Sequence, residues 1–223
     1  MRTLIVVAHP DDETLGAGAA IHRLTQEGNP VAVATMANQA AARTNLSSTL
    51  AEEQQRAFEL LGITKAYAAD FPNIKMNTVP HLELVQFIES CIADFGAEAV
   101  ITHHPSDVNN DHATTSGAVQ AAVRLFQRRD GIPALRELRY MENASATEWS
   151  LDSSLNRFLP NHYVEIGEEG LAVKLQALAC YKGVMRPYPH PRSAEALRGL
   201  AAWRGAQAGC LYAEAFETVF RRD

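Results

Sequence analysis

Cysteine is scarce in this sequence. Its 223 residues include three cysteines, Cys91, Cys180 and Cys210, which lie far apart and form no CxxC pair. This excludes the paired-thiolate metal sites and redox motifs that depend on such pairs, and it favours reduced, structural thiols. We therefore expect a protein of the cytoplasm.

Long apolar runs are absent as well. No stretch approaches the roughly 20 apolar residues that a membrane-spanning helix requires. The run at residues 4–8 is too short for the hydrophobic core of a signal peptide. We expect a protein that is neither exported nor inserted in a membrane.

Positive charge is in deficit. Lys and Arg number 20 against 26 Asp and Glu, which gives a formal net charge of -6, and no Lys/Arg cluster stands out along the chain. Nucleic-acid binding draws much of its affinity from neutralised phosphates, so we do not expect a nucleic-acid partner. The composition leaves the oligomeric state open, and a homo-oligomer is compatible with it.

Hydrophobic periodicity alternates between strand and helix. Residues 3–8 form a continuous apolar run typical of a strand buried on both faces. Residues 13–27 then repeat apolar positions at helical spacing. The same alternation predicts further strands at 31–36, 66–69, 99–102, 137–141 and 162–166, and helices at 49–61, 82–95, 111–129, 167–183 and 193–207. Such alternation implies right-handed crossovers and a mainly parallel sheet covered on both faces, so we expect one α/β domain over residues 1–223 with three layers, α/β/α.

Two later segments interrupt this pattern. Residues 143–161 are rich in Ser and Asn without a sustained period, which indicates a surface loop that either covers a site or is an inert connector. A Pro-rich break at residues 187–191 is followed by Arg192 and contains His190, and these two side chains could close over a site from the C-terminal region.

A polar cluster directly follows the first predicted strand. It contains His9, Asp11, Asp12 and Glu13 at the carboxyl end of that strand, where open α/β sheets bind ligands. The three-residue spacing of His9 and Asp12 across a tight turn can direct both side chains to one point, whereas Asp11 must project differently. Zinc accepts imidazole nitrogen and carboxylate oxygen, and a catalytic zinc needs a third protein ligand and one open position.

A second polar cluster, at residues 102–112, follows the fourth predicted strand. If the strand order reverses between the first and fourth strands, both clusters flank one crevice and His112 can complete a metal site. A single Asp near a helix start is usually only an N-cap, and Asp11, Asp12 and Asp111 could each be that. Two such clusters together are better explained by a metal site. At least one of the two histidines at 103 and 104 is expected to serve loop structure.

These motifs resemble those of a known family. Residues 8–13, Ala-His-Pro-Asp-Asp-Glu, and residues 109–112, Asn-Asn-Asp-His, are similar to the LmbE-like, or PIG-L, deacetylases, as are residues 53–62 and 212–216. The resemblance implies a Rossmann-like fold and zinc held by His9, Asp12 and His112. It further implies Asp11 as general base and an N-acetyl sugar derivative, a small molecule, as substrate.

The sequence departs from this family in two places. Many of its sugar deacetylases carry a His three positions before the last metal ligand, and Asn109 stands there in this chain. An amide can donate a hydrogen bond but cannot act as an acid, so either Asn109 stabilises the oxyanion electrostatically or a residue such as His104 takes that role. The Gly-rich loop after the second strand is replaced by residues 37–43. A non-sugar N-acyl small molecule is therefore the alternative substrate.

The resemblance and the residues together predict a hydrolytic mechanism. Zinc would lower the pKa of a bound water to about 7. Asp11 would take its proton and pass it to the leaving amine, and Asp107 or Asp111 could orient a ligand imidazole. Arg43 and Asp70 follow the second and third strands and could hydrogen-bond the substrate.

A nucleotide-binding module is the competing function. It is suggested by Gly16 and Gly18 near the start of the first helix. The third glycine of the dinucleotide fingerprint is missing, and the three acidic residues at 11–13 would repel a pyrophosphate at that helix N-terminus. We therefore favour the hydrolase.

Overall fold

The computed structural model describes residues 1–37, 49–151 and 157–223. Seven strands form one sheet: β1 (Thr3–Val7), β2 (Val31–Thr35), β3 (Lys65–Ala68), β4 (Ala99–His103), β5 (Glu137–Met141), β6 (His162–Glu165) and β7 (Ala213–Arg221). Six α-helices accompany them: α1 (Asp12–Gln26), α2 (Leu50–Leu61), α3 (His81–Phe95), α4 (Asn110–Ala122), α5 (Gly167–Cys180) and α6 (Ala194–Ala208).

The strand order places the ends of β1 and β4 side by side. The order is β3-β2-β1-β4-β5-β7-β6, and the first five of these strands run parallel. Strand β7 runs antiparallel between β5 and β6. The order therefore reverses between β1 and β4, which is where an open α/β sheet carries its ligand site.

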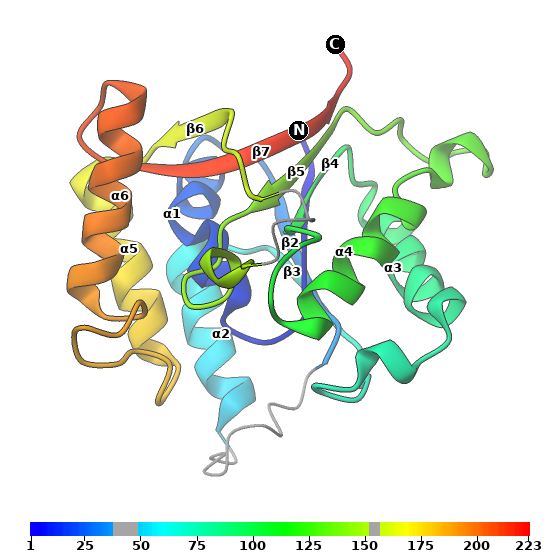
Figure 1. Cartoon of the computed structure of the whole chain (residues 1–223). Coiled ribbons are helices and arrows are strands. Elements are labelled where there is room, and N and C mark those ends of the chain that lie inside the picture. The colour runs from blue at the N-terminus through cyan, green and yellow to red at the C-terminus, as the bar shows by residue number, and fades with distance from the viewer. Residues whose placement is uncertain (38–48, 152–156) are drawn as a thin grey trace.

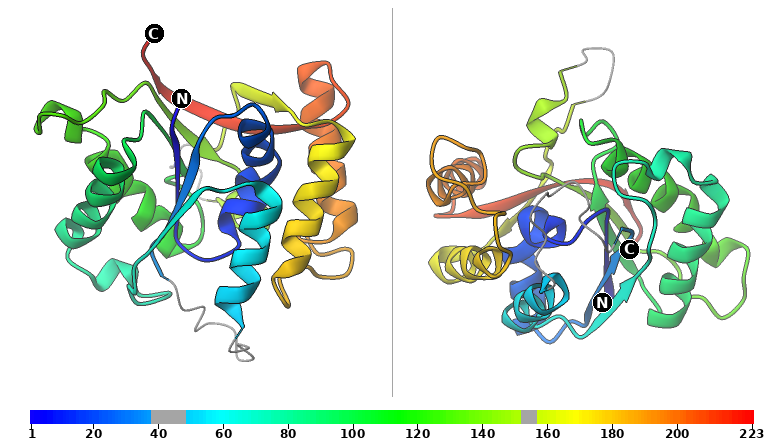
Figure 2. Two further views of the ribbon diagram at one scale, coloured as in Figure 1. Left: turned by 180° about the vertical axis from the view of Figure 1, so that it is seen from behind. Right: turned by 90° about the horizontal axis from the view of Figure 1, so that it is seen from below.

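Helices cover both faces of the sheet (Figures 1 and 2). Helices α3 and α4 lie on one face, and α1, α2, α5 and α6 lie on the other. Each face has its own apolar core: Leu4 and Val6 of β1 point to the α3/α4 side, whereas Ile5 and Val7 point to the α1 side. The expected three-layer α/β/α architecture with a mainly parallel sheet is confirmed.

Two elements differ from the sequence prediction. Strand β7 was not predicted, although Phe216, Thr218, Val219 and Phe220 give it a strand-forming composition. The helix predicted for residues 111–129 ends at Ala122, and a short 3₁₀ turn follows that buries Leu125 in the apolar core. Among the described helices, none is long and apolar enough to cross a membrane.

Candidate metal centre

The turn after β1 separates two neighbouring carboxylates. Asp11 adopts a left-handed conformation with φ 101°, and its carbonyl accepts the backbone N–H groups of Thr14 and Leu15 in the first turn of α1. This conformation is uncommon for residues other than glycine. It is supported by Glu13, whose Oε2 accepts the N–H of Asp11 at 3.2 Å. Asp11 and Asp12 consequently reach different partners.

Three predicted metal ligands converge at this turn. The candidate ligand atoms of His9, Asp12 and His112 all lie within 4.8 Å of one another. Oδ2 of Asp12 is 3.3 Å from Nδ1 of His9 and 3.2 Å from Nε2 of His112. His112 lies in the first turn of α4, which follows β4, and β4 pairs directly with β1. The reversal of strand order therefore brings the two motifs together as expected.

A carboxylate also contacts the imidazole of each candidate ligand on the side away from Asp12. Nε2 of His9 is 3.0 Å from Oδ2 of Asp111, and Nδ1 of His112 is 3.2 Å from Oδ2 of Asp107. Such partners fix the ring orientation and leave the other nitrogen facing the metal position. Asp107 and Asp111, expected as alternatives for this role, both make the contact.

The electrostatics of the cluster favour a cation. Burial opposes protonation of His9, yet its hydrogen bonds to Asp111 and Asp12 raise its pKa to about 9. Burial likewise opposes protonation of His112, but Asp12 and Asp107 raise its pKa to about 10. The buried carboxylates thus stabilise positive charge at this position. Two imidazole nitrogens and one carboxylate oxygen form a donor set that suits zinc, so the residues fit a catalytic metal.

His103 lies beneath this cluster. Its ring stacks on that of His112 with centroids 3.9 Å apart, and its Nε2 accepts the N–H of Ala8 at 2.9 Å. Burial and the neighbouring His112 lower its pKa to about 3, so the ring is neutral. His103, Asp107 and His112 form a second group with the spacing of metal ligands, but all three are buried, whereas His9 in the first group is partly exposed. Of these two groups, the first is the one with a residue open to solvent.

Asn109 and His104, the two candidates for the oxyanion, have different surroundings. Oδ1 of Asn109 accepts the N–H of Asp111 at 2.9 Å, which makes Asn109 the N-cap of α4 and turns its amide nitrogen away from the helix. His104 instead has Nε2 3.3 Å from Oε2 of Glu217 and Nδ1 2.8 Å from Oγ of Ser106. These contacts hold the ring of His104 against Glu217 of β7.

The two predicted substrate-binding residues are less informative. Asp70 is exposed just after β3, where its backbone bridges to Ala37 at the end of β2. This is the expected end of the sheet, and its role stays a prediction. Arg43 lies outside the described residues.

Three further residues reach the cluster from distant parts of the chain. Nη1 of Arg192 lies 3.7 Å from Oδ2 of Asp11, and Nδ2 of Asn143 donates to Oδ1 of Asp12 at 3.0 Å. Oγ1 of Thr147 donates to Asp107 at 3.0 Å. Arg192 and the polar loop at 143–161 carried a weak signal in the sequence, since each stood in an irregular segment of its own.

Comparison with known proteins gives independent evidence on the family of this chain. The model of the PIG-L family, described as GlcNAc-PI de-N-acetylase, matches residues 4–123, more than half of the chain. The uncharacterized deacetylase YaiS of Escherichia coli K12 is 27% identical over 187 residues, which cover 80% of this chain and 89% of that protein.

Solved structures share the fold. The N,N'-diacetylchitobiose deacetylase of Pyrococcus horikoshii superposes with a TM-score of 0.78 at 19% identity, covering 98% of this chain and 83% of that one. The 4-carboxy-2-hydroxymuconate hydratase GalB of Pseudomonas putida KT2440 superposes with a TM-score of 0.79 at 20% identity, covering 100% and 98%. The fold therefore accommodates more than one chemistry. Because the family model matches more than half of the chain, the chain belongs to the PIG-L, or LmbE-like, deacetylase family.

Proposed function

We propose that this protein is a zinc-dependent hydrolase that removes the acetyl group from the nitrogen of an amino-sugar derivative. The observation that carries the proposal is the convergence of His9, Asp12 and His112, with ligand atoms within 4.8 Å of one another, next to the separately oriented carboxylate of Asp11. Three protein ligands leave a zinc ion one position for water or substrate, as catalytic sites require.

The side chains of the site have separate roles in this proposal. A zinc ion held there would supply Lewis acidity, which acidifies water and stabilises negative charge on a carbonyl oxygen. The Asp11 carboxylate takes a proton from the attacking water and delivers it to the amine nitrogen as the carbon–nitrogen bond breaks, so that acetate and a free amine are released. The amide nitrogen of Asn109 donates a hydrogen bond to the oxyanion.

An amino sugar is the favoured substrate class. The family description refers to a GlcNAc derivative, and one protein of similar structure is named as a diacetylchitobiose deacetylase. Arg43 and Asp70 are the side chains that we propose to hydrogen-bond the sugar hydroxyls. An N-acylated small molecule without a sugar is the alternative.

Metal analysis combined with an acetate-release screen tests the proposal. We expect about one zinc per chain, and much less in His112→Ala because a three-ligand site loses one anchor. The metal-loaded protein should release acetate from N-acetyl amino sugars and fail to do so as Asp11→Asn. Release only from acylated amines or amino acids would support the non-sugar alternative. Full zinc content in His112→Ala would contradict the ligand assignment, and absence of acetate release from the whole panel would contradict the deacetylase.

A further inference from the structure

We propose that the turn at residues 143–147, which lies outside the segment matched by the family model, positions the metal ligands. Asn143 holds Asp12 directly, and Thr147 holds His112 through Asp107. The proposal rests on the metal site of the proposed function and assigns to it two positioning residues that the motifs do not contain.

The contacts form a closed ring. Asn143 Nδ2 donates to Asp12 Oδ1 at 3.0 Å, and Asp12 Oδ2 lies 3.2 Å from His112 Nε2. His112 Nδ1 lies 3.2 Å from Asp107 Oδ2, which accepts from Thr147 Oγ1 at 3.0 Å. The N–H of Asn143 donates to Thr147 Oγ1 at 2.9 Å and closes the ring. One short turn therefore supports ligands that come from two different helices.

The turn is itself rigid. The carbonyl of Asn143 accepts the N–H groups of Ala146 and Thr147 at 3.2 and 3.0 Å. The carboxylate of Glu148 accepts the N–H groups of Ser145 and Ala146 at 2.6 and 3.1 Å. Because these hydrogen bonds fix the backbone of the turn, the two side chains are held in place before any metal binds, which is what positioning of a site requires.

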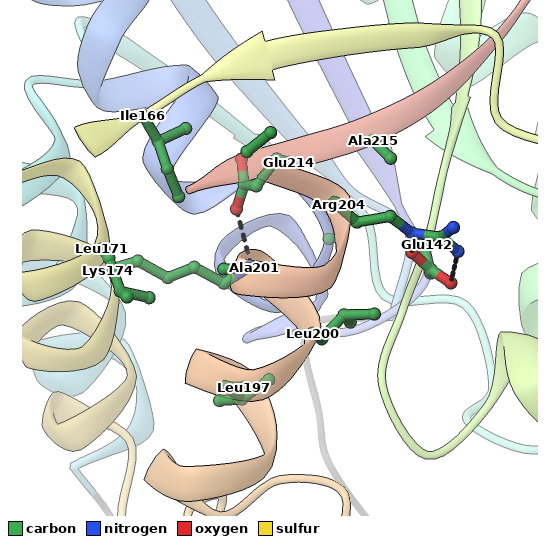
Figure 3. Close-up of a pocket in the computed structure, with 12 residues that line it drawn as sticks. Glu142, Ile166, Leu171, Lys174, Leu197, Leu200, Ala201, Arg204, Glu214 and Ala215 are labelled. Carbon is green, nitrogen blue, oxygen red and sulfur yellow. Dashed lines mark hydrogen bonds and ion pairs between the residues drawn. The ribbon is translucent and has the colours of Figure 1, made fainter. Parts of the chain in front are cut away.

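Neighbouring elements fix the turn to the body of the protein. Glu142, which precedes it, forms a bidentate ion pair with Arg204 of α6 at 3.0 and 2.6 Å, and Figure 3 shows these two side chains facing each other. On the other side, a Cβ at Gly16 would lie 2.3 Å from Asn143 Oδ1. Because Gly16 has no side chain, Asn143 can pack close to α1 and reach Asp12.

The chemistry of Asn143 argues against a purely structural role. The residue is 1% exposed, and its Oδ1 has no hydrogen-bond partner among the described residues. A buried polar atom left unsatisfied destabilises a protein, so an apolar side chain would serve packing better. The bond from its Nδ2 to Asp12 is the contact that accounts for an amide at this position.

Zinc affinity measured by competition with a chelator tests the Thr147 arm without any substrate. Thr147→Val keeps the shape of the side chain and removes the hydroxyl, and we expect zinc to bind about 10- to 100-fold more weakly, as for other outer partners of metal ligands. Thr147→Ser retains the hydroxyl and should bind zinc like the wild type. Thr25→Val is the matched control, because the Thr25 hydroxyl donates to the carbonyls of His22 in α1 and Leu61 at the end of α2, neither of which belongs to the candidate metal site.

Two further variants keep the test decisive. Asn143→Ala should also weaken zinc binding about 10- to 100-fold, and it serves if Thr147→Val does not fold. Thr147→Val combined with Asp107→Asn should weaken binding by less than the product of the two single effects, because Thr147 acts through Asp107. Wild-type zinc affinity in both Thr147→Val and Asn143→Ala would overturn the proposal, as would equal losses in Thr147→Val and Thr147→Ser.

These results are separable from the test of function. If the wild type binds zinc but releases no acetate from any substrate while the variants weaken the metal as expected, the positioning role stands and the deacetylase fails. If the wild type releases acetate while the variants bind zinc normally, the positioning role fails and the deacetylase stands.

Discussion

Arg192 and Asp11 meet inside the site, with the guanidinium Nη1 3.7 Å from the carboxylate Oδ2. Ser145 holds the guanidinium in place, because Nε of Arg192 donates to Oγ of Ser145 at 2.8 Å. Arg192 belongs to the segment between α5 and α6, whereas Asp11 is the N-cap of α1. A charged residue of the C-terminal region therefore lies beside the proposed general base.

Removal of this guanidinium should lower turnover without loss of metal. In Arg192→Met the side chain keeps its length but no longer holds the carboxylate of Asp11, and misplacement of a reacting group can cost about 10²-fold in rate. We expect unchanged zinc content and a fall in kcat of that order. Arg186→Met, an exposed residue of the same segment, is the control. Wild-type kcat in Arg192→Met would show that the contact has no part in catalysis.

Asp11 and Asp12 should differ in their effects although they are neighbours. Asp12 contacts both candidate ligand histidines and Asp11 contacts Arg192, so Asp12→Asn should weaken zinc binding. Asp11→Asn should retain zinc and substrate affinity while losing about 10²- to 10⁴-fold in turnover. Metal content and single-turnover rates of the two variants decide the matter. The opposite pattern would exchange the two roles, and full activity in both would refute the mechanism.

A methyl group at Gly16 should disturb the candidate metal centre by displacing Asn143. The new Cβ of Gly16→Ala would lie 2.3 Å from Asn143 Oδ1 and 2.5 Å from Met141 Sδ. We expect a loss of about 1 to 3 kcal/mol in the free energy of unfolding from overpacking, together with weaker zinc binding. Gly199 lies in α6, and a Cβ added there would have no neighbouring atom within 4 Å outside its own helix. Gly199→Ala should therefore stabilise the protein by about 0.5 to 1 kcal/mol. Thermal melts and zinc titrations of both variants provide the comparison, and equal behaviour would contradict the packing argument.

Two substitutions of Asn109 separate its capping role from its proposed donor role. Asn109→Ala loses both and should cost about 1 kcal/mol of stability. Asn109→Ser keeps a cap for the N–H of Asp111 but removes the amide. If the amide donates to the oxyanion, both variants should lose about 10²-fold in kcat with zinc content unchanged. Near-normal turnover in Asn109→Ser would restrict Asn109 to helix capping.

The sequence was sufficient for the parallel part of the sheet and for the placement of the candidate ligands at the ends of its strands. The apolar run before His9 and the one before His103 identify β1 and β4, and the polar residues that follow them lie at the same edge because parallel strands share direction. Both observations are local in the chain, so periodicity and spacing predict them without knowledge of the rest of the fold.

The supporting residues could not be predicted in this way. Asn143 is 131 positions away from Asp12, and its partner follows from the packing of the β5 end against α1. Gly16 gave a misleading signal, since glycines near a helix start are also typical of nucleotide sites. A glycine is needed at this position because Asn143 approaches it closely, and a tertiary contact of this kind is not visible in the local sequence. Strand β7 was missed because an antiparallel insertion breaks the βα alternation on which the prediction depended.

The placement of β7 between β5 and β6 has a consequence for the order of folding. Strand β6 lies at the sheet edge, and β7 is its only neighbour in the described sheet. During translation β6 leaves the ribosome before β7. It therefore cannot form its strand pairing until residues 213–221 have also been exposed. We expect nascent chains arrested before residue 213 to leave β6 sensitive to protease, while β1 to β4, whose partners precede or closely follow them, are already protected.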